Sequence, residues 1–86
     1  MLFHIEQTHD PADCPYGSGG SRKLHDASAP GVDILGVYGA YTEHTIFLVV
    51  EATDIDALHA LLAPGMHTCT TRITPVSERI MPPPAS

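Results

Sequence analysis

The sequence predicts an α+β fold in which a four-stranded antiparallel sheet carries one clear helix. Four segments have the alternation or the branched and aromatic composition of strands, and a segment before the last strand has helical spacing of its apolar residues. A stretch rich in Pro and Gly stands where a further helix would be expected. The 86 residues allow one domain, which we place at residues 1–77, followed by a mobile Pro-rich tail at 78–86.

The first strand is predicted at residues 2–9. Phe3 and Ile5 fall on one side of the alternation, and His4 and Glu6 fall on the other, which is the period of a strand. Residues 10–30 are then interrupted by six Pro or Gly residues, so that only a short, degraded helix fits within them. Long loops in compact domains are usually functional or flexible, and we expect a partly ordered cover here.

The second and third strands are predicted at residues 32–41 and 44–52. Gly36 and Gly39 indicate a bulge or a close backbone approach in the second strand. Residues 46–50 form the most apolar run of the chain, which is typical of a central strand covered on both faces. The helix can cover one face, and the other face needs a partner.

The helix is predicted after Thr53 and Asp56, which form a weak capping signal, and it ends at residues 64–65, which are Pro-Gly. Its apolar side would consist of Ile55, Leu58, Leu61 and Leu62. The fourth strand follows at residues 67–76, where Thr alternates with other residues.

The resulting element order matches a ferredoxin-like arrangement with strand order 4-1-3-2. With this order, the start MLFH at residues 1–4 and the segment THDP at 8–11, the chain resembles small bacterial ferredoxin-like proteins that pair through their sheets as dimeric α+β barrels. The resemblance implies a homodimer, which would cover the second face of the sheet. It leaves the chemistry open, because that group includes cofactor-independent oxygenases, isomerases and binding proteins.

The composition excludes several classes of function. A net charge of −6 disfavours nucleic-acid and membrane-surface roles, because both partners are anionic. The first residues show neither a basic stretch nor a long apolar run, so we expect a cytoplasmic protein. The two Cys, Cys14 and Cys69, form no C-x-x-C motif, which argues against thioredoxin-like and zinc-ribbon proteins, and a reducing cytosol favours free thiols or metal ligands.

The predicted topology gathers His and Cys residues at one end of the sheet. In the order 4-1-3-2 the end of the first strand lies beside the starts of the third and fourth strands. Thiolates and imidazoles together form a ligand set for zinc or copper in tetrahedral geometry. We therefore predict a metal site drawn from His9, Cys14, His44 and Cys69, with His67 in reserve.

Each of these residues also has a structural interpretation. His67 follows a Pro-Gly turn and fits a loop residue, while Cys69 fits a small buried hydrophobe on a strand. His9 before residues 10–11 fits a strand end and its turn. Cys14 lies in a polar loop and is harder to explain as a core residue.

His4 and Glu6 occupy the other side of the first strand. We favour an ion pair of Glu6 with Arg72 on the neighbouring fourth strand. Alternatively, His4 lies in a dimer cavity as a general base, with Tyr38 or Tyr41 as the proton donor.

Three functions are consistent with these patterns. The leading hypothesis is a small cytoplasmic metal-binding protein, with zinc first and copper second by ligand type. The alternative is a cofactor-independent enzyme of the isomerase or oxygenase type, with a small-molecule ligand in the dimer cavity. The third is a binding or assembly subunit whose acidic surface meets a basic partner. Whether the protein is an enzyme is left open by the sequence.

Overall fold

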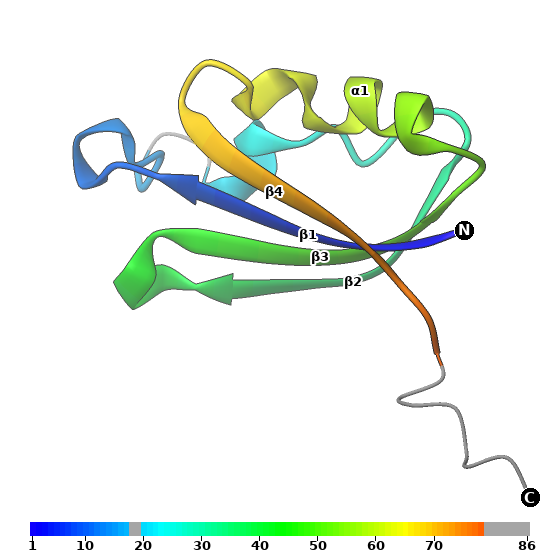
Figure 1. Ribbon diagram of the computed structural model, residues 1–86. Helices are drawn as coiled ribbons and strands as arrows, with labels where there is room; N and C mark the ends of the chain where they lie inside the picture. Colours follow the sequence, from blue (N-terminus) through cyan, green and yellow to red (C-terminus); the bar gives the residue numbers. More distant parts are fainter. Residues whose placement is uncertain (18–19, 79–86) are drawn as a thin grey trace, which may run out of the picture.

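The computed structural model describes residues 1–17 and 20–78. It contains one antiparallel sheet in the order β2-β3-β1-β4, with a helical layer on one face (Figure 1). The strands are β1 (Leu2–His9), β2 (Val32–Ala40), β3 (Thr45–Ala52) and β4 (Cys69–Val76), and the helix is α1 (Leu58–Leu62). This confirms the predicted fold class, because the order 4-1-3-2 is the same sheet read in reverse.

The core lies between the sheet and the helical layer. Alternation along β1 turns Phe3, Ile5, Gln7 and His9 toward this layer, and all four are buried. The antiparallel register sets Ile5 between Leu48 on β3 and Ile73 on β4. The apolar core consists of Phe3, Ile5, Leu24, Ala29, Ile46, Leu48, Val50, Ala52, Leu58, Leu61 and Leu62.

The helix is shorter than predicted and has a different start. The carboxylate of Asp54, not the side chain of Thr53, accepts a hydrogen bond of 3.0 Å from the backbone N–H of Ala57. A 3₁₀ turn over Ile55–Ala57 precedes α1, and another over Ala63–Gly65 follows it. Ile55 is 58% exposed. The tighter 3₁₀ turn rotates its side chain away from the apolar side that a continuous α-helix would form.

The long loop contains a 3₁₀ turn over Ser21–Leu24 in place of the degraded helix. Leu24 is buried, and its carbonyl accepts a 2.8 Å hydrogen bond from Nε2 of Gln7 on β1. Gly65 packs against the same place: a Cβ there would lie 2.6 Å from the Leu24 carbonyl oxygen, so the close approach requires glycine. The loop is thereby held against the core as a cover.

The opposite face of the sheet carries a mixture of aromatic and polar side chains. His4 lies beside Phe47, with ring centroids 5.8 Å apart. Glu6 and Arg72 are partners in the β1–β4 register, yet among the described residues they form no ion pair, and that expectation is wrong. Arg72 is exposed on an edge strand, where a pair of long charged side chains gains little over its solvated state.

Two expectations lie beyond what is described. Most of the predicted tail, residues 79–86, falls outside the described part of the chain. Pairing of two sheets into a dimer stays a prediction. Within the described ranges, no helix is long and apolar enough to cross a membrane.

Candidate metal centre

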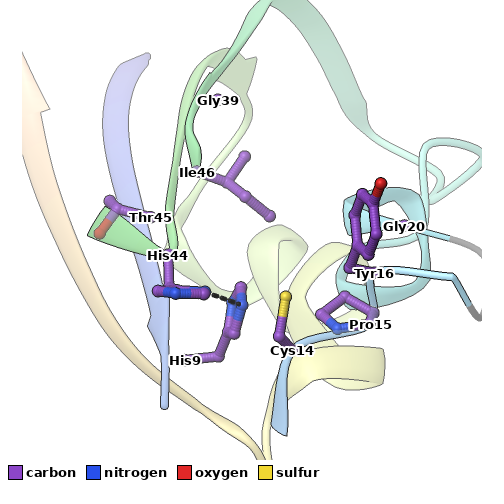
Figure 2. A pocket seen from close by; sticks show the side chains of 9 residues that line it. All are labelled: His9, Cys14, Pro15, Tyr16, Gly20, Gly39, His44, Thr45 and Ile46. Atoms are coloured by element: carbon purple, nitrogen blue, oxygen red, sulfur yellow. Dashed lines mark hydrogen bonds between the residues drawn. The ribbon is translucent and has the colours of Figure 1, made fainter. Parts of the chain in front are cut away.

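Three side chains from three separate segments converge at one end of the sheet (Figure 2). His9 is the last residue of β1, Cys14 follows the first loop turn, and His44 immediately precedes β3. One potential ligand atom from each side chain lies within 4.8 Å of the other two. Three of the five predicted metal ligands therefore meet in space.

His9 is positioned by the strand itself. Its place in the alternation buries the imidazole, which is 8% exposed, and its backbone N–H donates a 3.1 Å hydrogen bond to the His44 carbonyl. The Nε2 atom of His9 lies 3.3 Å from Nδ1 of His44, and the two rings meet at an interplanar angle of 80°. The sheet pairing thus holds both imidazoles at one point.

His44 has an unusual backbone conformation. A 3₁₀ turn over Tyr41–Glu43 leads into it, and its φ of +52° lies in the left-handed region. Residues with a Cβ adopt this region at a cost of roughly 1–3 kcal/mol, and such strain tends to collect at functional sites. This conformation lets the chain enter β3 while the imidazole turns toward His9.

A short turn of the chain brings Cys14 close to His9. A 3₁₀ turn over Pro11–Asp13 follows Asp10, and the backbone N–H of Cys14 donates a 3.3 Å hydrogen bond to the Pro11 carbonyl. Pro at the start of this turn is favourable, since the first N–H of a helical turn needs no internal partner. The thiol is free and half-buried, and Figure 2 shows its sulfur beside the His9 imidazole.

The separation of the two imidazole nitrogens suits a tetrahedral ion. With zinc–nitrogen bonds of about 2.0–2.1 Å, two nitrogens on one tetrahedral ion stand about 3.3 Å apart. The observed distance from His9 Nε2 to His44 Nδ1 is 3.3 Å, at which the two nitrogens form a hydrogen bond that a bound ion would replace. A thiolate on the same ion would lie about 3.6 Å from each nitrogen, which is inside the 4.8 Å that encloses the three potential ligand atoms.

The buried ring of His9 also has an unsatisfied nitrogen. Its Nδ1 atom is inaccessible to solvent and has no hydrogen-bond partner among the described residues. A buried nitrogen in this state costs about 1–3 kcal/mol, and native proteins usually satisfy such groups with a water, an ion or a ligand. It is the other ring nitrogen, Nε2, that faces His44, so an ion between the two imidazoles would leave Nδ1 unchanged.

A cavity of about 120 Å³ adjoins the three side chains. Pro15 and Tyr16 form one wall, and Gly39 and Ile46 lie across from them on the sheet (Figure 2). Gly20 and Thr45 complete the lining. No sequence pattern indicated these wall residues, apart from Gly39, where a bulge or a close backbone approach was expected and a Cβ would instead meet no atom within 4 Å.

Cys69 and His67 lie outside the group of three. Cys69 is the cross-strand partner of His9, but its sulfur lies near Gly65, 3.2 Å from where a Cβ would stand. Burial raises the pKa of this thiol, and the Asp13 carboxylate acts in the same direction against a hydrogen bond from Thr68. His67 is exposed in the turn before β4. Their role as ligands stays a prediction.

The alternative site on the open face is less complete. His4 contacts Phe47 there, and Tyr38 is 62% exposed, with its ring over Gly36. The side chain of Tyr41 lies outside the described part of the structure. Phe47 lies between His4 and Tyr38, because it also pairs with Tyr38 in the register of β2 and β3.

Residues 1–79 match a family described as "Domain of unknown function (DUF3303)". No curated protein and no solved structure matches the chain.

Proposed function

Because the chain belongs to the DUF3303 family, whose description assigns no function, we propose its function from the site: it binds one zinc ion through His9, Cys14 and His44. The observation that supports this most strongly is the convergence of three potential ligand atoms within 4.8 Å. His44 lies 35 residues after His9 and is brought to it by the sheet pairing, whereas Cys14 follows His9 by about five residues and returns through one short turn.

The donor set favours zinc over other ions. Two imidazoles and a thiolate are borderline to soft ligands, which zinc and copper accept and which magnesium and calcium do not favour. Copper is the second candidate, because two His and one Cys form the trigonal plane of blue-copper sites. Those sites usually add a weak axial Met, and none of the described residues that line the cavity is Met. Zinc therefore remains first.

Metal binding also gives a physical reason for one costly feature. His44 holds a strained φ, which lowers the stability of the fold, so a compensating interaction at the same place is expected. A metal–ligand bond to the His44 imidazole supplies that interaction, since metal binding to a folded site adds directly to folding free energy.

Matched cysteine variants test the proposal. Zinc affinity is measured by chelator competition for tag-free protein and for Cys14→Ser and Cys69→Ser. Cys14→Ser should lose at least about 100-fold in affinity, because even loss of a second-shell partner costs about 10–100-fold. Cys69→Ser should bind like the parent. Equal affinity in Cys14→Ser and the parent would contradict the proposal.

A further inference from the structure

The three protein donors leave one tetrahedral position beside the cavity. Structural zinc sites usually have four protein ligands, whereas three ligands and an open position are typical of zinc sites that bind exogenous molecules. His9, Cys14 and His44 all line the cavity of about 120 Å³, so an ion held between them borders it. The fourth position is therefore accessible to a small molecule that fits there.

The walls restrict the chemistry of that molecule. Beyond the ligands, the cavity is lined by Pro15, Tyr16, Gly39 and Ile46, together with Gly20 and Thr45. None of the described lining residues is Lys, Arg, Asp or Glu. A ligand with a second charge would find no partner, and burying an unpaired charge is costly.

We infer, on the basis of the proposed function, that the fourth metal position takes a small organic monothiol, bound as a thiolate with its apolar body in the cavity. The ion and the Cys14 thiolate together leave one positive charge, which a single anionic sulfur neutralises. Soft sulfur also matches the borderline character of the donor set. On binding, the thiol releases its proton to solvent, and its sulfur replaces water on the ion.

The volume limits the length of the carbon chain. The cavity is open on one side, since Tyr16 in its wall is 91% exposed, and its volume of about 120 Å³ can cover a chain of about two or three carbons. Each methylene that enters the cavity should improve affinity by up to about fourfold, which is the effect of removing that group completely from water. Propanethiol should therefore bind more tightly than ethanethiol.

Gly39 offers a variant that fills the cavity without touching the ligands. It pairs with Ile46, so a side chain there shares the covered face, and a Cβ would meet no atom within 4 Å. Its φ is not in the left-handed region, so valine fits the strand backbone. Ala40→Val is the matched control, because Ala40 is the next residue of β2 and faces the opposite side.

The experiment uses cobalt(II) as a spectroscopic substitute for zinc in tag-free, oxygen-free protein. Propanethiol is titrated while the sulfur-to-cobalt absorption in the near ultraviolet is followed, with propionate as the hard-donor comparison. The parent and Ala40→Val should show a saturable increase of one added thiolate. Gly39→Val should retain cobalt but lose at least about 10-fold in propanethiol affinity, with Gly39→Ala in between.

The outcomes separate the two proposals. Failure of the parent to bind cobalt would overturn the proposed function. Cobalt binding without a response to propanethiol, or an equal response to propionate, would overturn the thiol assignment alone. Equal thiol affinity in Gly39→Val and Ala40→Val, with cobalt retained in both, would show that the thiol does not occupy this cavity.

Discussion

The strained backbone at His44 gives the sharpest test of how the site is built. His44→Gly and His44→Ala both remove the imidazole, so they differ only in the Cβ atom at a φ of +52°. Alanine at a left-handed position is less stable than glycine by about 1 kcal/mol, even after the greater freedom of glycine in the unfolded chain is included. For a domain of this size, about 1 kcal/mol corresponds to a melting-temperature difference of about 4–8 °C. The glycine variant should melt higher.

Thermal unfolding of both variants and the parent, with and without zinc, measures this difference. Zinc at about 100 times its dissociation constant should stabilise the parent by about 2.7 kcal/mol. Both variants should lose most of that gain, because each lacks one ligand. If His44→Ala without metal melted at or above His44→Gly, the assigned left-handed conformation would be refuted. If either variant kept the full zinc effect, His44 would not be a ligand.

Three further predictions concern other groups. Zinc should protect Cys14 from alkylation. Cys69 should react slowly with or without metal, because burial raises the pKa of its thiol. Peptide mapping after alkylation measures both rates, and protection of Cys69 by zinc would instead make Cys69 a ligand. Burial lowers the pKa of His25 below its usual 6.5, so its contribution to stability is present above that value and is lost as the pH falls below it. Denaturant unfolding of metal-free protein measures the free energy of unfolding, which should fall less on acidification in His25→Gln than in the parent. An equal fall in both proteins would contradict this role of His25. If two sheets pair through the open face, Phe47→Glu should be monomeric in sedimentation while the parent is dimeric, and a monomeric parent would remove the dimer from the account.

Sequence patterns were sufficient to predict the sheet, because its covered face is apolar and its open face carries polar residues. Phe3 and Ile5 alternate with polar residues, and a one-residue slip would bury His4 and Glu6 instead, so the register of β1 has one stable solution. The helix was harder to predict. Its apolar residues fit a 3.6-residue period, but Asp54 starts a 3₁₀ turn that takes Ile55 out of the core.

The sequence predicted the end of the sheet at which the site lies, but not which side chains meet there. Strand order brings the end of β1 beside the starts of β3 and β4, which explains why His9, His44 and Cys69 could be named together. The directions of their side chains could not be read from the pattern. His44 depends on a left-handed φ after a 3₁₀ turn, and the sulfur of Cys69 turns toward Gly65. Neither conformation follows from residue spacing.

The position of Cys14 was the hardest part of the site to predict from the sequence. Its return to His9 depends on one short turn after Asp10, which the Pro at position 11 favours but does not determine. The wall of the cavity depends on the same segment through Pro15 and Tyr16. Loop conformations of this kind depend on tertiary contacts, such as the hydrogen bond from Gln7 to Leu24 that holds the cover in place.

The most direct test of the central claim is X-ray absorption at the zinc edge of tag-free protein loaded with one equivalent of zinc. We expect two imidazole nitrogens at about 2.0–2.1 Å, one sulfur at about 2.3 Å and one further light donor. Alteration of this shell in Cys14→Ser, with loss of the sulfur, would assign the thiolate. A shell of oxygen donors without sulfur, or a chain that retains no zinc, would contradict the claim that His9, Cys14 and His44 form a metal centre.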